Sequence, residues 1–471
     1  MDTWIQEELA ILDLGDVRLD RRCQQILQRL YSKPSLSIPA ASATLAEIAA
    51  TYRFFDNDRV DDFELLRPHR HATLERLRAH PVVLLVQDTT EFDYSRPEEI
   101  LVGAGPLTLE ACSGFHDHVQ LAVTPERLAL GVIDADIWGR DPEEFGKRKD
   151  KKQKPIQDKE SFRWLQGYRR ACEVAAEVPG TQLISIADAE GDIYECFLAG
   201  VPAPEQRKAD WIIRAAQNRC LLPEAEPDDE AARLLRSAVA KAPVLGQVVV
   251  EVSKKLKRKA RTAIMTVQSA TVLLQPPQRL GVKLAPVTIN VVLLRESQPP
   301  GGEEPIEWLL LTNLPVATFH EAVAIATYYA CRWQIEIFFK ILKSGCKVEK
   351  LQLHTEDRLK PCLILYHIIA WRVLYLTMLG RACPEIPCDA VFAEEEWKSV
   401  WTIQQSEPVP TTPPTLAAFL KLVAGLGGHM GRKGDGDPGV QTMWIGLQRT
   451  IDFALAWQAF GPDATRANAS P

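Results

Sequence analysis

The chain alternates between short apolar runs and longer helical patterns, and its clearest signal is a set of buried strands. Residues 82–86, 183–187 and 211–214 are short runs rich in valine, isoleucine and leucine. Such runs are typical of strands covered on both faces of a sheet. The first two end in acidic residues, Asp88 and Asp188. In open α/β sheets the ligand crevice lies at the carboxyl ends of the strands, so we expect these two acids to lie close together.

Longer patterns place helices at both ends of the chain and more strands in its middle. Residues 1 to about 75 have a helical pattern, and so do residues 160–176. Residues 119–138 predict a hairpin that turns at residues 125–127. Between about 240 and 312, several β-rich runs predict an antiparallel insertion: 247–252, 262–267, 271–275, 287–294 and 308–312.

The final third returns to helices. Thr318, with Glu321 three residues later, forms a capping box that begins a long helix, and Gly345 is its natural end. Residues 362–379 are apolar but interrupted by a histidine and an arginine, which predicts a buried helix and no membrane span. We therefore expect three domains: residues 1–75, residues 76–360 with the β-rich insertion at about 220–312, and residues 361–471.

Composition narrows the class of protein without identifying a ligand. The 471 residues are 46% hydrophobic and 25% charged, the balance of a soluble globular protein with ample core. The formal charge of −7 gives no whole-chain signal for nucleic acid, so any such binding must come from local patches. The ten cysteines form no CxxC pair and the N-terminus shows no signal-peptide pattern, which favours a reducing cytoplasm.

Two basic runs stand out against the acidic background. Isolated charge runs are usually solvated loops. Two of them inserted beside the strand-end acids favour contact with a nucleic acid backbone, without readout of its sequence. The runs are Lys147, Arg148, Lys149, Lys151, Lys152 and Lys154, and Lys254, Lys255, Lys257, Arg258, Lys259 and Arg261.

The most informative chemical pattern lies on the long helix. At about 100° per residue, four functional side chains fall at roughly 0°, 300°, 340° and 320° and share one narrow stripe. They are Tyr329, Arg332, Glu336 and Lys343. A carboxylate flanked by a hydroxyl, a guanidinium and an ammonium suits a site that holds a metal and a phosphate together. The alternative is that Arg332 and Lys343 pair with surface acids, for about 0.2–0.5 kcal/mol each.

Asp88, Asp188 and Glu336 together form a candidate metal site. Three carboxylates brought together repel, and their pKa values rise unless a cation neutralises them. Mg²⁺ prefers oxygen ligands and binds through a few carboxylates plus substrate phosphates. Two such ions can activate an attacking oxygen and stabilise a leaving one. The pattern predicts a metal-dependent nuclease or strand transferase, although a lone strand-end aspartate is more often a cap or turn residue.

These motifs resemble those of bacterial cut-and-paste DDE transposases of the insertion-sequence-four type, the class that includes the transposon-five enzyme. The match rests on the Tyr-x2-Arg-x3-Glu-x6-Lys stripe, on Asp88 in Asp-Thr-Thr and on Asp188 in Asp-Ala-Glu-Gly-Asp. It extends to residues 14–16 and 52–54, and more weakly to the final third. One departure is Ala189, where many relatives carry a basic residue.

The resemblance implies an α/β fold: an RNase H-like catalytic core with the β-rich insertion, flanked by a helical DNA-binding N-terminal domain and a helical C-terminal domain that forms the dimer. Members of the family nick each transposon end, form and open a hairpin, and join the 3′ ends to target DNA. Asp88, Asp188 and Glu336 would hold two Mg²⁺ ions, with Mn²⁺ able to substitute. The expected partners are double-stranded DNA and a second copy of the chain, without a membrane, in the bacterial cytoplasm and on the nucleoid when bound to DNA.

The resemblance also implies a set of DNA contacts. Trp308 would stack a base flipped out during hairpin formation, although by default it is an ordinary core tryptophan. His116 and His118 alternate on one strand face, and without a third ligand we expect a structural or phosphate-adjacent role for them. The expected DNA-binding residues are Tyr329, Arg332, Lys343, Trp308, Arg214, Arg219, Lys254, Lys255, Lys257 and Arg258.

Two other functions are compatible with parts of the sequence. A DNA-binding regulator could share the scaffold without catalysis, but three intact acids argue against it. A glycosidase would need two carboxylates without cationic neighbours, which Arg332 and Lys343 make improbable.

Overall fold

We analysed a computed structural model of the chain. It describes residues 2–96, 101–109, 111–143, 155–202, 207–222, 233–252, 261–278, 282–432 and 434–462. The first of the basic runs, and the second except for Arg261, lie outside these residues.

The N-terminal part is helical, as the sequence predicts. Four of its helices begin at a side chain that accepts a hydrogen bond from the first turn, namely Asp16, Ser37, Thr44 and Asp61. Their apolar faces pack on one another and on the later helix α11. The helices are α1 (Thr3–Glu8), α2 (Val17–Ser32), α3 (Ile38–Ala41), α4 (Leu45–Phe55) and α5 (Asp62–Leu77).

A mixed sheet forms the centre of the molecule. The described residues build ten strands in the order β2-β3-β1-β5-β6-β10-β9-β8-β7, with β4 beside β3. The pairs β1–β5 and β5–β6 are parallel and the other pairs are antiparallel. The strands are β1 (Val82–Asp93), β2 (Gly105–Pro106), β3 (Ser113–Val123), β4 (Ala129–Trp138), β5 (Gln182–Ala187), β6 (Asp210–Arg214), β7 (Val244–Val252), β8 (Arg261–Leu274), β9 (Val287–Glu296) and β10 (Glu307–Thr312).

Strand β1 differs from the sequence prediction. We expected a strand ending near Asp88, but β1 continues to Asp93 because it stays paired with β3 as far as Gly114. Only its parallel pairing with β5 ends early, at Val86 and Ile186. Asp88 and Asp188 each follow that last parallel pair by two residues. The two acids therefore come from neighbouring strands at the same level of the sheet.

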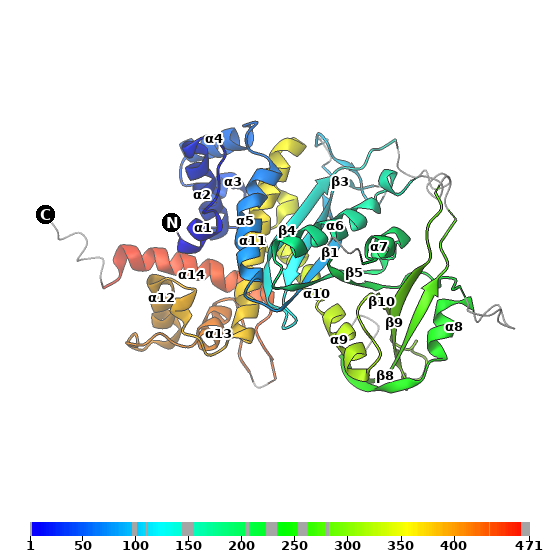
Figure 1. Cartoon of the computed structure of the whole chain (residues 1–471). Coiled ribbons are helices and arrows are strands. Elements are labelled where there is room, and N and C mark those ends of the chain that lie inside the picture. The colour runs from blue at the N-terminus through cyan, green and yellow to red at the C-terminus, as the bar shows by residue number, and fades with distance from the viewer. Residues whose placement is uncertain are drawn as a thin grey trace.

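The β-rich insertion is antiparallel, as predicted, and it extends the same sheet. Strand β10 pairs with β6 on one side and with β9 on the other. Figure 1 shows β8, β9 and β10 at the end of the molecule away from the N-terminal helices. The runs 262–267 and 271–275, which we expected as separate strands, are one strand, β8.

The remaining helices cover the sheet and build the C-terminal part. The 27-residue helix α11 is long and apolar enough to cross a membrane, yet 94% of its apolar window is buried inside the protein. Helices α5 and α11 lie side by side against β4 (Figure 1). The helices are α6 (Phe162–Glu177), α7 (Tyr194–Ala199), α8 (Leu235–Ala240), α9 (Phe319–Ala330), α10 (Trp333–Lys340), α11 (Glu356–Ala382), α12 (Glu394–Gln405), α13 (Leu416–Leu426) and α14 (Val440–Phe460).

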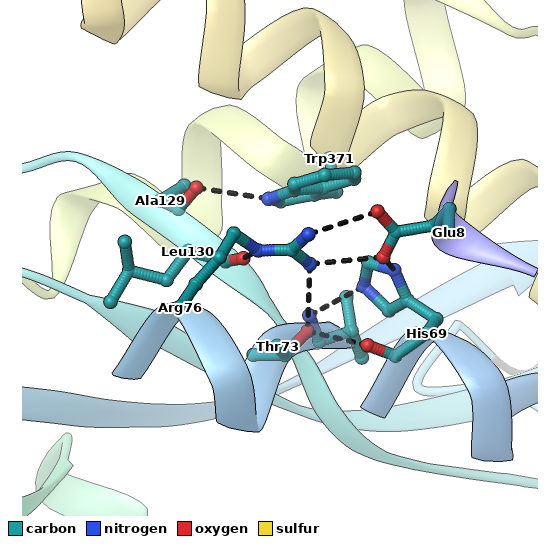
Figure 2. A network of polar contacts seen from close by, with 8 residues as sticks. Glu8, His69, Thr73, Arg76, Ala129, Leu130 and Trp371 are labelled. Carbon is teal, nitrogen blue, oxygen red and sulfur yellow. Dashed lines mark hydrogen bonds and ion pairs between the residues drawn. The ribbon is translucent and has the colours of Figure 1, made fainter. Parts of the chain in front are cut away.

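A buried polar network joins the N-terminal helices to the sheet (Figure 2). Glu8 of α1 accepts two hydrogen bonds of 2.9 Å from Arg76 of α5, and its carboxylate lies 2.5 Å from Nδ1 of His69. The Arg76 guanidinium lies 4.3 Å from the ring centre of Trp371 on α11 and donates to the Leu130 carbonyl of β4. The Glu8 carboxylate thus ties α1 to α5, and Arg76 extends the network to α11 and β4.

Candidate active site

Arg332 links two of the three predicted metal-binding acids. Its Nη1 donates to Asp88 Oδ2 at 2.8 Å, and its Nη2 donates to Glu336 Oε1. The side chains of Arg332 and Asp88 are 12% and 17% exposed, whereas that of Glu336 is 39% exposed. Although burial favours the neutral form, the two carboxylates raise the pKa of Arg332, so it remains charged. Residues 244 positions apart therefore meet in one site.

Asp188 completes the acidic cluster. It follows β5, and its Oδ1 accepts a 2.8 Å hydrogen bond from the Glu190 N–H, which caps a short 3₁₀ turn. The pKa of Asp88 is raised to about 7, chiefly by burial and then by the negative charge of Asp188. Glu336 acts in the same direction, and Arg332 opposes both. A carboxylate that resists ionisation beside two others is the electrostatic signature of a site that needs a cation.

The three acids offer the oxygen ligands that Mg²⁺ prefers, and the raised pKa of Asp88 fits a cation site. Among the described residues, however, no three acidic, histidine or cysteine side chains converge closely enough to hold one ion. The contacts explain this, because the Arg332 guanidinium lies between Asp88 and Glu336. Arg332 thus supplies the positive charge in this arrangement.

The sequence pattern predicts one long helix through Arg332 and Glu336. In the structure this helix is interrupted at Arg332. The capping box at Thr318 and Glu321 is confirmed. Helix α9 then gives way to α10 through tighter hydrogen bonds from residue i to residue i−3, including Arg332 N–H to the Tyr329 carbonyl at 3.0 Å. A π-helical turn, Ile341–Gly345, follows α10. Such irregular turns inside helices often mark functional sites.

Lys343 lies within this π-helical turn, where the angles of an ideal α-helix do not apply. Its Nζ lies 5.8 Å from the ring centre of Phe92, four residues beyond Asp88 on β1. Four residues of strand span about 13 Å. Lys343 therefore lies farther along β1 than Arg332, which contacts Asp88.

Tyr329 contacts Trp308 and lies within electrostatic reach of Arg332 and Arg214. Tyr329 is buried, and its ring meets the Trp308 ring edge to face at 5.5 Å. Burial raises the pKa of the Tyr329 phenol, with Arg332 and Arg214 lowering it. The charge of Asp188 raises the same pKa, so three charged residues act on the phenol. Arg214 ends β6 with an exposed side chain.

Several other predicted DNA contacts have different surroundings. Arg219 has an 8% exposed side chain that binds Asp192, so a phosphate could reach it only by displacing that carboxylate. His118 bonds Thr89 at 2.8 Å and Gln87 at 3.2 Å, so both of its ring nitrogens have partners in the core. His116 bonds Glu91 through Nε2, and its buried Nδ1 has no hydrogen-bond partner among the described residues. Four predicted DNA-binding residues lie outside the described residues, and no contact is assigned to them: Lys254, Lys255, Lys257 and Arg258.

Sequence reasoning missed Asp192. It is the second aspartate of the Asp-Ala-Glu-Gly-Asp motif, and its side chain is fully buried. The motif itself was the available signal, since a buried aspartate needs hydrogen-bond donors or a paired charge.

The chain matches three family models in succession. Residues 1–60 match the model for transposase DNA-binding, and residues 203–371 match the transposase DDE domain. Residues 368–459 match the transposase Tn5 dimerisation domain. The DDE match contains Glu336 but begins after Asp88 and Asp188. Among solved structures, the chain is similar to one described as the piggyBac transposase synaptic complex with hairpin DNA. The two share 8% identity with a TM-score of 0.37, over 98% of this chain and 80% of that chain.

Proposed function

The chain belongs to the DDE transposases of the Tn5 type, and from that premise we propose that it cuts out a DNA element and joins the freed 3′ ends to target DNA. The observation that carries the proposal is the meeting of Asp88 and Glu336 at Arg332, with the charge of Asp188 acting on Asp88. One acid from β1 and one from α10 thus meet at a single arginine, and the third acid directly follows the neighbouring strand β5.

We assign the metal site to Asp88, Asp188 and Glu336. Bound Mg²⁺, or Mn²⁺ in its place, would activate the attacking oxygen and stabilise the leaving one. Arg332 is suited to hold the scissile phosphate, because a guanidinium binds phosphate oxygens through two parallel hydrogen bonds. Its present partners are carboxylates that also present two oxygens. We assign Tyr329, Lys343 and Arg214 to the flanking phosphates, which they would position.

DNA-end recognition is assigned to residues 1–75. The outward face of α2 carries exposed arginines, among them Arg18, Arg21 and Arg29. Phosphate contacts of this kind set the register of a protein on a duplex without reading its sequence. The C-terminal domain, residues 361–471, is assigned to the dimer contact. Its last helix exposes the apolar side chains Leu455 and Phe460, which are 56% and 87% exposed.

The proposal is tested with DNA that carries the inverted repeats flanking the gene. Purified protein should nick these ends in the presence of Mg²⁺ or Mn²⁺, and a chelator should abolish nicking while end binding persists. Gel-resolved strand cleavage and a mobility-shift assay measure the two activities separately. Binding without nicking at any metal concentration would favour the alternative function, a catalytically silent regulator of transposition.

Trp308 should act in hairpin formation. It lies half-buried against Tyr329, where a flipped base could stack on its free face. Stacking of one base contributes about 1–3 kcal/mol, which corresponds to about a 5- to 150-fold slower hairpin step in Trp308→Ala. The first nick should keep its rate, and Trp308→Phe should restore part of the hairpin step. Equal loss of the nick and the hairpin would assign Trp308 to packing alone.

A further inference from the structure

Asp192 and Arg219 form a buried ion pair, and Asp192 is close in sequence to the strand-end acid Asp188. Arg219 donates from Nε to Asp192 Oδ1 at 2.9 Å and from Nη2 to the Asp192 carbonyl at 2.7 Å. The Asp192 side chain is fully buried and that of Arg219 is 8% exposed. The Arg219 guanidinium also lies 5.0 Å from the ring centre of Phe197. A pair this buried has given up its hydration, so it persists only because both charges are satisfied.

Both carboxylate oxygens of Asp192 are bound by the segment that follows β6. Its Oδ1 binds Arg219, while its Oδ2 accepts hydrogen bonds of 2.8 Å from the backbone N–H groups of Ala216 and Gln217. These two residues follow Arg214, which ends β6. One carboxylate thus fixes the segment after β6 against the segment after β5.

The segment after β5 is short and conformationally restricted. Asp188 caps it through the Glu190 N–H, and the Asp192 N–H donates to the Ala189 carbonyl at 3.3 Å. A Cβ on Gly191 would come within 2.5 Å of the Ala187 Cβ, so this turn packs directly on the end of β5. Three residues separate Asp188 from Asp192, and hydrogen bonds hold both ends of that span.

We propose that Asp192 and Arg219 form a positioning clamp that sets Asp188 and Arg214 relative to each other for metal and phosphate binding. This role rests on the proposed function and replaces a direct DNA contact by Arg219. The surroundings of Tyr329 agree with it, since Asp188 and Arg214 both act on that phenol. Outer residues that orient metal ligands typically change metal affinity or activity by about 10- to 100-fold when altered.

The test compares Arg219→Lys and Asp192→Asn with the wild type. Lysine keeps the charge but lacks the planar fork, and asparagine keeps the shape but loses the charge. Arg236→Lys is the matched control, because Arg236 lies in a nearby segment with a 43% exposed side chain paired with Glu307. Three quantities are measured: end-DNA affinity by fluorescence anisotropy, Mn²⁺ affinity by calorimetry, and single-turnover nicking as a function of Mn²⁺ concentration.

The clamp predicts that Arg219→Lys and Asp192→Asn bind Mn²⁺ about 10- to 100-fold more weakly. End-DNA affinity should stay within about twofold of the wild type, since phosphate contacts elsewhere supply it. Nicking should recover partly at high Mn²⁺ concentration, and Arg236→Lys should match the wild type. Thermal melting of each variant identifies global unfolding; if Asp192→Asn unfolds, Arg219→Lys alone decides.

Other outcomes overturn the clamp in distinguishable ways. Weaker end binding with unchanged Mn²⁺ affinity in Arg219→Lys would restore Arg219 as a DNA contact. Unchanged Mn²⁺ affinity and nicking in a folded Arg219→Lys would reduce the pair to core packing. If the wild type itself neither binds Mn²⁺ nor nicks, the proposed function fails and the clamp falls with it, whereas normal wild-type activity confines a failure to the clamp.

Discussion

Asp88→Asn, Asp188→Asn and Glu336→Gln are each expected to lower strand cleavage by about 10³-fold or more while end binding stays near the wild-type value. Removing a single preorganised group that stabilises developing charge typically costs about 10²- to 10³-fold. A metal ligand should cost at least as much, because it holds the ion that acts on both oxygens of the reaction. Cleavage of labelled DNA ends under single-turnover conditions measures the loss, and a mobility shift measures binding.

The amide substitutions keep the size of each side chain, so the fold should be retained. Asp93→Asn is a matched control on the same strand as Asp88, because Asp93 is exposed and its carboxylate accepts the nearby Ser95 N–H. It should cleave at the wild-type rate. Cleavage that survives in Asp88→Asn, Asp188→Asn or Glu336→Gln would remove that acid from the metal site.

Glu8→Ala is expected to destabilise the protein by about 3–5 kcal/mol, the usual effect of removing one partner from a buried ion pair. Glu8 is 4% exposed and binds both Arg76 and His69. His69 accepts the Val132 N–H at Nε2, so its remaining proton lies on Nδ1 and points at Glu8. Urea unfolding followed by tryptophan fluorescence measures the change. Glu7→Ala is the control, because Glu7 is the exposed neighbour.

The same residue predicts a pH dependence. Burial by itself raises the pKa of Glu8, but His69 and Arg76 outweigh it and lower the pKa from 4.5 to about 2. A depressed carboxyl pKa stabilises the fold above the unfolded pKa, and that stability is lost as the pH falls through the folded value. The shift corresponds to about 3 kcal/mol, lost between about pH 5 and pH 2. The stability difference between wild type and Glu8→Ala should therefore shrink over this window; a constant difference would show that packing dominates.

Much of the fold follows from local patterns in the sequence. The buried runs before Asp88 and Asp188 are strands, the Thr318 capping box begins a helix, and the β-rich insertion is antiparallel. These features depend on neighbouring residues, so periodicity and capping chemistry are sufficient to find them.

The features that sequence patterns missed depend on tertiary partners. Strand β1 continues through polar residues because β3 pairs with it. The sequence of residues 89–93 alone does not indicate this pairing. The predicted stripe assumed the angles of an ideal helix. The tight turn at Arg332 and the π-helical turn that ends at Gly345 depart from those angles. The direction of the Arg219 side chain was set by Asp192, a partner 27 residues away. Sequence patterns can nominate residues for the chemistry, but they do not contain the mutual geometry of those residues.

Helix α11 limits how this protein can be divided. The DDE match ends at residue 371 and the dimerisation match begins at residue 368, so the two modules change over in the middle of one buried helix. Both halves of that helix are packed inside the protein, and Trp371 at the junction contacts Arg76 and bonds to β4. A chimaera that exchanges C-terminal modules between relatives at this sequence boundary would cut through helix α11, which both modules share. Recombinant fragments should instead keep residues 356–382 whole, on the catalytic side.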